Sequence, residues 1–377
     1  MSTVRGVGPR SRGSIWTLLK PSVNWLLVFV PLGAMLDRMD SVPAPLVFFT
    51  AALAIVPAAA LIVRSTEQIA ARTGDAVGGL LNATFGNAPE LIIATVALRA
   101  GLPDMVRASI IGAVLANLLL AIGLAFLLGG LRHRDQQYSA SASRVYSTMM
   151  LLAVISLIVP SAFERSFSAP EYLPQAQTLN TLLAWSLLAV YGLYLVFMLR
   201  THPHLFKSAE AENEHDEATA WSMPRALGGL LVASVLAAWM SELLVGAAEA
   251  TGDMLGMSEV FIGIVIVAIV GGAAESLSAI SAGRRNKVDL TLGIAYGSSV
   301  QIALFVAPVL VLLSRVIAPE PLRLAFAPAE LWVLFLTILI GTVISGDGRS
   351  NWFKGAQLIA VYAIIALFFY FVPELPT

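Results

Sequence analysis

The chain has 377 residues, of which 58% are hydrophobic and only 12% are charged. Soluble domains usually carry about 25% charged residues, so a water-soluble globule is excluded and the sequence predicts an all-α integral membrane protein in a lipid bilayer. There is no cysteine, which excludes thiolate ligands and thiol nucleophiles. The formal net charge of −1 gives no indication of nucleic-acid binding.

Stretches of roughly 20 apolar residues can cross a bilayer as helices. The sequence predicts about eleven, at residues 23–37, 43–63, 76–98, 106–131, 145–162, 178–199, 224–250, 257–282, 289–314, 327–345 and 354–372. Residues 1–40 are expected to hold a basic segment and the first helix. Residues 41–200 and 223–377 are expected to be two five-helix repeats, separated by an acidic cytoplasmic loop at 201–222. No cleaved signal peptide is predicted, because the first 22 residues lack a continuous apolar region.

Lysine and arginine are divided unevenly between the predicted loops. If the N-terminus lies inside, 17 of the 23 basic residues fall on the inner side, as the positive-inside rule requires. We therefore expect a cytoplasmic N-terminus and an outer C-terminus. The expected location is the inner (plasma) membrane, or a vacuolar-type membrane in a eukaryote.

Two stretches of the chain repeat each other. When residues 86–112 are aligned with 271–297, 185 residues later, eight of 27 positions are identical, including Glu90 with Glu275. The two copies fall in the third and eighth predicted helices. Because that offset is odd, the copies should cross the membrane in opposite directions, which predicts inverted repeats.

Both stretches place a carboxylate in an apolar segment beside residues that loosen a helix. A carboxylate inside a bilayer indicates a functional site by default, and Pro89 removes a backbone hydrogen-bond donor. Carboxylate, amide and freed carbonyl oxygens are the ligands that Ca²⁺ takes. The candidate cation and proton site comprises Gly86, Asn87, Glu90, Asn117, Gly271, Glu275, Ser298, Ser299 and Gln301. Without a cation, at least one carboxylate is expected to bind a proton, so cation and protons would compete for one site.

Several alternatives remain open from the residues alone. A single intramembrane glutamate can be a structural hydrogen-bonding group, and Asn117 and Gln301 suit an interhelical hydrogen bond as well as a ligand role. The cation could be Na⁺, K⁺ or another divalent ion, and a passive cation channel would also use paired carboxylates. No metalloprotease, nucleophile-elbow or P-loop motif supports an enzyme. No cofactor is expected besides the transported cation, and a homo-oligomer is left open.

The run from Gly79 to Ala94, GLLNATFGNAPELIIA, closely resembles the first signature of the calcium/cation antiporter superfamily. It is most similar to the cation/proton exchanger branch, which contains bacterial calcium/proton antiporters. Further matches lie at residues 21–31, 106–112, 117–120, 286–290 and 297–306. The resemblance implies an eleven-helix antiporter that exports Ca²⁺ in exchange for H⁺ by alternating access. It also implies that Glu90 and Glu275 bind the cation and exchange protons, helped by the amide and hydroxyl groups named above.

The second signature departs from that family pattern. The branch usually reads Gly-Asn-Ala-Ala-Glu-His, but Gly272 and Ser276 stand in place of the asparagine and the histidine. In the first repeat, a usual serine is Ala113. These departures leave the site with fewer oxygen ligands than the family pattern has. The sequence therefore does not decide the cation selectivity or the proton stoichiometry.

Overall fold

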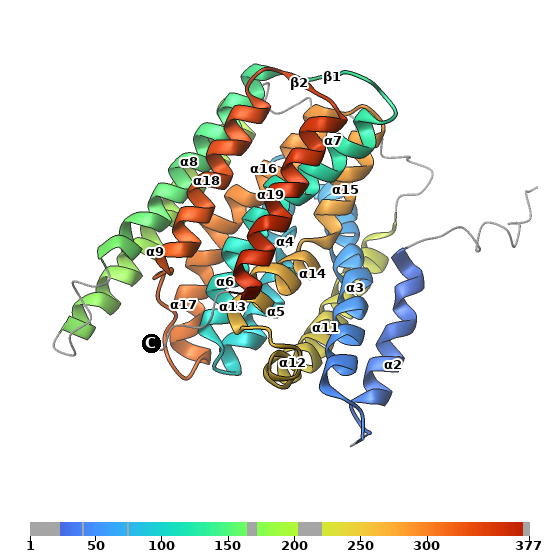
Figure 1. Cartoon of the computed structure of the whole chain (residues 1–377), viewed down its shortest axis with the longest axis vertical. Helices are drawn as coiled ribbons and strands as arrows, with labels where there is room; N and C mark the ends of the chain where they lie inside the picture. Colours follow the sequence, from blue (N-terminus) through green and yellow to red (C-terminus); the bar gives the residue numbers. More distant parts are fainter. Residues whose placement is uncertain (1–22, 40, 74, 164–171, 203–220, 372–377) are drawn as a thin grey trace, which may run out of the picture.

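The computed structural model of the chain describes residues 23–39, 41–73, 75–163, 172–202 and 221–371. This part is almost entirely helical, which confirms the predicted fold class (Figure 1). The basic first 22 residues and the acidic cluster from Glu210 to Glu217 fall outside the described residues.

The helices of the first half are η1 (Val23–Val28), α2 (Phe29–Leu36), α3 (Ala44–Thr73), α4 (Asp75–Phe85), α5 (Ala88–Arg99), α6 (Pro103–Leu115), η2 (Ala116–Ala121), α7 (Ile122–Gly130), α8 (Ala140–Phe163), α9 (Leu173–Val196) and η5 (Phe197–Thr201). Those of the second half are α11 (Met223–Gly246), α12 (Ala248–Leu255), α13 (Glu259–Phe261), η8 (Ile262–Val267), α14 (Ala268–Gly271), α15 (Ala273–Arg284), α16 (Val288–Gln301), η9 (Ile302–Val306), α17 (Ala307–Ile317), α18 (Pro328–Ser345) and α19 (Trp352–Phe371). Two short strands, β1 (Gln136–Gln137) and β2 (Arg349–Ser350), pair antiparallel at one end of the molecule.

Eight helices in the described residues are long and apolar enough to cross a bilayer, or nine if the bent pair from Ala248 to Gly271 is one span. Each of the eleven predicted segments coincides with one of the described helices or with several consecutive ones. The count of eleven spans stays a prediction, because the remaining segments are short or interrupted. The outer faces of α9, α18 and α19 expose large apolar side chains, such as Leu193 and Val343, as lipid-facing surfaces do.

Two segments predicted as continuous helices are broken. The segment at 76–98 divides between α4 and α5 at Gly86 and Asn87, and the segment at 257–282 divides between α14 and α15 at Gly272. The first break fits the local sequence, because Pro89 lies in the opening turn of α5, where a missing N–H costs nothing. Other boundaries also differ from the prediction: α3 runs ten residues past the predicted end at 63, α8 and α9 each begin five residues before the predicted starts at 145 and 178, and α11 ends at Gly246, short of 250.

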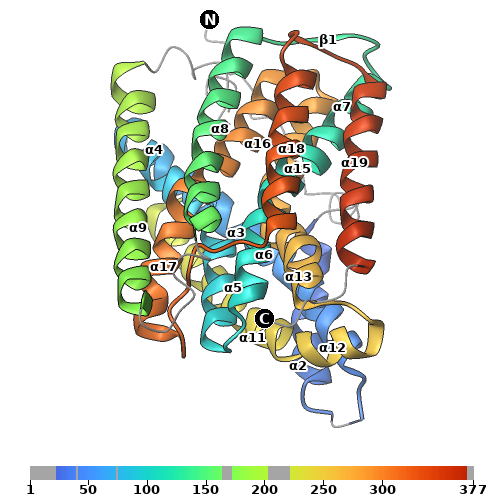
Figure 2. The same ribbon diagram turned by 60° about the vertical axis from the view of Figure 1, so that its left-hand side comes forward.

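The repeat predicted from sequence recurs in the backbone. The bounds of α5 and α15 are offset by the same 185 residues as the sequence match. The turns after them also match, since Gly101 and its equivalent Asn286 both adopt positive φ, at 81° and 66°. α5 and α6 lie toward one end of the molecule, whereas α15 and α16 lie toward the end with β1 and β2 (Figures 1 and 2). The two copies therefore lie at opposite ends, as inversion requires.

Glycines allow the central helices to cross closely. A Cβ atom on Gly112 of α6 would lie 2.2 Å from the carbonyl oxygen of Ile264 in η8. A Cβ atom on Gly263 would lie 2.4 Å from the carbonyl oxygen of Met105. Only glycine permits backbones to approach so closely, so this crossing holds the two halves together.

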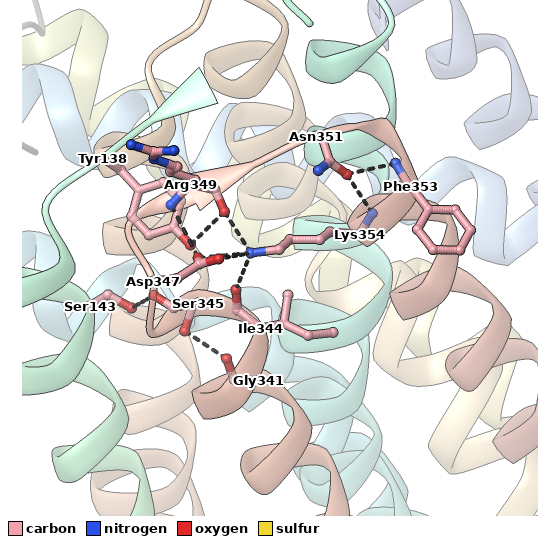
Figure 3. Close-up of polar contacts among 10 residues, drawn as sticks. All are labelled: Tyr138, Ser143, Gly341, Ile344, Ser345, Asp347, Arg349, Asn351, Phe353 and Lys354. Atoms are coloured by element: carbon pink, nitrogen blue, oxygen red, sulfur yellow. Dashed lines mark hydrogen bonds and ion pairs between the residues drawn. The ribbon is translucent and has the colours of Figure 1, made fainter. Parts of the chain in front are cut away.

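A polar cluster ties the ends of several helices together beside the strands (Figure 3). The Lys354 ammonium donates to the Asp347 carboxylate at 2.6 Å and to the carbonyl oxygens of Ile344 and Arg349. The bond to Ile344 satisfies one of the last carbonyls of α18. Gln136 of β1 donates to the Gly283 carbonyl at 2.9 Å, which joins the strands to the end of α15.

Candidate functional site

Glu90 and Glu275 each lie in the first turn of a helix that begins just after a break. α5 begins at Ala88 and α15 at Ala273, so each glutamate is the third residue of its helix. The first N–H groups of a helix have no partner within it and carry partial positive charge, which favours a nearby carboxylate. The bundle thus holds two helix N-termini, each with its own carboxylate.

The side chain of Glu90 packs onto the break between α14 and α15. A Cβ atom on Gly271 would lie 3.1 Å from Glu90 Cγ, and one on Gly272 would lie 3.7 Å from Glu90 Oε1. Both carboxylate oxygens of Glu90 and Oε2 of Glu275 are buried without a hydrogen-bond partner among the described residues. Buried carboxylates without partners are costly, so these oxygens are candidates for binding protons or a cation.

Four predicted site residues form one hydrogen-bonded chain between the two repeats. Asn117 Nδ2 donates to Ser298 Oγ at 3.2 Å, and Ser298 Oγ donates to Asn87 Oδ1 at 3.3 Å. Asn87 Nδ2 then donates to Gln301 Oε1 at 2.5 Å. The contacts join η2 and α16 to the residue that precedes α5, so the chain fixes the first break against the second repeat.

Ser299 does not join this network. Its hydroxyl donates to the carbonyl oxygen of Ala295, one turn earlier in the same helix, at 2.8 Å. Such a bond is common for serine inside a helix. Ser299 is fully buried, and it stands one residue along from Ser298 on a different face of α16.

A cavity of about 650 Å³ reaches the site from one side. Glu275, Asn87, Gly86 and Gln301 line its wall, and it extends to Arg285 in the turn between α15 and α16. This turn contacts β1 through Gln136, so the cavity runs toward the end of the molecule that carries the strands.

Glu90 faces a different and much smaller hollow. This pocket, of about 20 Å³, is lined by Glu90, Ala94, Ser109 and Ala113, among others. Such a volume holds roughly one water molecule. The two glutamates, equivalent in sequence, therefore differ in access, because Glu275 contacts the large cavity and Glu90 does not.

Sequence reasoning did not assign a role to Glu67, which lies near the end of α3. Its side chain is exposed on the wall of the cavity that Glu275 also lines. The signal was its position at the inner end of an apolar segment. Among the described residues, no three histidine, cysteine, aspartate or glutamate side chains are grouped to hold a metal ion. A cation at this site would therefore need amide, hydroxyl or carbonyl oxygens beside the two carboxylates.

Comparison with known proteins identifies the family of this chain. The family model described as "Sodium/calcium exchanger protein" matches residues 43–200 and 225–371. The chain belongs to this family. Both matched ranges include one helix break with its glutamate.

Relatives named as Ca²⁺/H⁺ antiporters match along most of their length. A Ca²⁺/H⁺ antiporter of Aphanothece halophytica is 41% identical over 367 residues, which cover 93% of this chain and 96% of the relative. The Ca²⁺/H⁺ antiporter ChaA of Bacillus subtilis is 39% identical over 350 residues, covering 91% of this chain and 98% of the relative. The solved structure of native YfkE matches with a TM-score of 0.79 and 36% identity, covering 93% of this chain and all of that one.

Proposed function

We propose that the protein is a Ca²⁺/H⁺ antiporter in which Glu90 and Glu275 bind the cation and exchange it for protons. The observation that carries the proposal is the pair of buried helix N-termini, each with a glutamate whose carboxylate has an unpartnered oxygen among the described residues. Relatives named Ca²⁺/H⁺ antiporters match over more than nine-tenths of the chain. One chain holds both carboxylates, so one chain is the proposed transport unit.

Exchange follows from competition for the same oxygens. Two carboxylates neutralise one divalent cation, and the amide oxygens of Asn87 and Gln301 are hard ligands of the kind that Ca²⁺ takes. When the cation leaves, the carboxylates are stabilised in this apolar setting by protons. If the site can switch between the two sides of the membrane only when it holds either the cation or protons, the cation moves across in one direction and protons move in the other.

Alternating access is supported by a difference between equivalent glycines. Gly112 of α6 is packed tightly against η8, but a Cβ atom on its equivalent, Gly297 of α16, would meet nothing within 4 Å. Gly297 lines the large cavity instead. The side without the large cavity is thus the one where the helices cross closely.

The same offset relates Ile264 of η8 to Gly79 of α4. Gly79 also lines the cavity. Closure of the cavity is therefore proposed to bring α4 onto α16, as η8 now lies on α6. The crossing of η8 and α6 would then open on the opposite side.

The proposed orientation places the cavity on the cytoplasmic side of the membrane. Arg64, Arg285 and Lys287 line the cavity, and basic residues favour the inner face. The bacterial relatives make the plasma membrane the proposed location, with the N-terminus inside and the C-terminus outside.

Everted membrane vesicles test the proposal directly. In vesicles loaded with protons, addition of Ca²⁺ should release protons, and Na⁺, K⁺, Mg²⁺ and Mn²⁺ at equal concentration should each release fewer. No response to Ca²⁺ would contradict calcium as the substrate. Cation flux that continues after the proton gradient has been collapsed, and that moves no protons, would indicate a passive channel.

A further inference from the structure

The two helix breaks differ at one equivalent position. Asn87 precedes α5, and Gly272 stands in its place before α15. The Asn87 amide makes two hydrogen bonds, to Gln301 and from Ser298. Position 272 has no side chain to make such contacts.

Gly272 lies beside two oxygen acceptors. A Cβ atom built there would be 3.7 Å from Glu90 Oε1 and 3.8 Å from Asn117 Oδ1. An amide one bond further out would therefore reach both oxygens. Glu90 Oε1 is buried with no hydrogen-bond partner among the described residues, so an amide at position 272 would offer it one.

Substitution at this position is sterically acceptable. The backbone has φ −81° and ψ 14°, which any L residue adopts. The nearest atom to an added Cβ would be the Ala268 carbonyl oxygen at 3.4 Å, an ordinary contact. Glycine is therefore not required by the fold here, in contrast to Gly112.

We propose that Gly272 sets the cation selectivity of the exchanger. Because glycine has no side chain, a water molecule that hydrates the bound cation can occupy the space beside Glu90. This inference rests on the proposed function. A water bridging the cation to Glu90 and Asn117 replaces the amide that the first half supplies through Asn87. Ions such as Mg²⁺ lose their hydration water reluctantly and usually keep several waters when bound. A site that leaves a place for water therefore accepts Mg²⁺ and Mn²⁺ beside Ca²⁺, whereas a full set of protein ligands would favour Ca²⁺.

The test compares wild type, Gly272→Ala and Gly272→Asn as purified full-length protein in detergent. Binding of Mn²⁺ is followed by the electron paramagnetic resonance signal of the free ion, and Ca²⁺ is added as competitor. Gly272→Asn should raise the preference for Ca²⁺ over Mn²⁺ about tenfold, the effect of roughly one good polar contact. Gly272→Ala adds the Cβ without the amide and should leave that preference nearly unchanged.

Equal preferences in wild type and Gly272→Asn would overturn the inference. So would a change in Gly272→Ala as large as that in Gly272→Asn, because volume alone would then explain it. If Gly272→Asn does not give a monodisperse protein, Gly272→Ser carries the same test with a shorter polar group. Wild-type vesicles that release no protons on addition of Ca²⁺ would contradict the proposed function itself, whereas normal exchange with equal preferences contradicts only the role of Gly272.

Discussion

Gly112 and Gly297 occupy equivalent positions in the two repeats, but only Gly112 is packed against a neighbouring backbone. A Cβ atom on Gly112 would lie 2.2 Å from the Ile264 carbonyl oxygen, whereas one on Gly297 would meet nothing within 4 Å. The two repeats therefore share a sequence pattern but differ in how their equivalent glycines pack against neighbouring helices. This difference is what a transporter with one open side requires.

The contrast predicts opposite effects of the same substitution on stability. Gly112→Ala must push α6 from η8 and should cost about 1–3 kcal/mol, as overpacking usually does. Gly297→Ala should be neutral or stabilise by up to about 1 kcal/mol, because alanine restricts the unfolded chain and favours a helix. Thermal unfolding of the purified proteins measures both. Equal losses in the two variants would show that Gly112 has no special packing role in solution.

A disulfide can trap the proposed closed cavity. The chain has no native cysteine, so Gly79→Cys with Gly297→Cys gives a clean background. If α4 closes onto α16, the two thiols should cross-link under oxidising conditions, and transport should stop until a reductant is added. Pairing Gly228→Cys with Gly297→Cys is the control, because Gly228 does not line the cavity and a Cβ atom on it would meet nothing within 4 Å. Absence of the cross-link at every pH and Ca²⁺ concentration would contradict this movement.

Neighbouring serines should differ in their importance for transport. Ser298→Ala removes a hydroxyl that contacts both Asn117 and Asn87. We expect about tenfold weaker apparent Ca²⁺ affinity, comparable to the loss of a group that orients metal ligands. Ser299→Ala removes only a bond to the Ala295 carbonyl within its own helix and should transport nearly as well as wild type. Vesicle assays at graded Ca²⁺ measure both, and a larger loss in Ser299→Ala would assign the ligand role to Ser299 instead.

The cluster beside β2 predicts a pH-dependent contribution to stability. Partial burial acts to raise the pKa of Asp347, but hydrogen bonds from Lys354 and the Arg349 N–H outweigh it and hold the pKa below its usual value. A lowered pKa in the folded state stabilises the fold above the unfolded pKa, and this contribution is lost as the pH falls through the folded value. Asp347→Asn should therefore destabilise at neutral pH by no more than about 1 kcal/mol, since Asp347 is largely exposed.

The loss of stability caused by Asp347→Asn should disappear in acid. Thermal unfolding of wild type and variant should converge once the pH is well below about 3.9, the ordinary aspartate value. Lys354→Met is the matched comparison, because it also removes the donors to Ile344 and Arg349. It should cost more than Asp347→Asn at every pH. A constant difference between wild type and Asp347→Asn would rule out the charge as its cause.

Much of this architecture was predictable because apolar length and repeat identity are local properties of a sequence. The match of Glu90 with Glu275 predicted a paired site, and the paired helix breaks now have matching bounds. Residues that loosen a helix were identified directly before both glutamates, but the sequence did not show that each helix ends there, because glycine and asparagine only permit a break and tertiary contacts decide whether it forms. For the same reason the sequence could not separate Ser298 from Ser299.

Access to the two glutamates was also beyond the sequence. Glu275 lines the large cavity and Glu90 the small pocket, yet both follow nearly the same local pattern. The difference arises because η8 packs closely on α6, whereas Gly297 of α16 has no neighbouring backbone, and such contacts join distant parts of the chain. Local propensity carries no information on such contacts.

The most direct test of the paired-carboxylate mechanism is Ca²⁺-dependent proton release from everted vesicles that carry wild type, Glu90→Gln or Glu275→Gln. Each substitution keeps the shape of the side chain but removes its exchangeable charge. The proposal predicts proton release in wild type and none in either variant, with both variants inserted in the membrane and monodisperse after extraction. Proton release at wild-type rates in both variants would contradict the central claim.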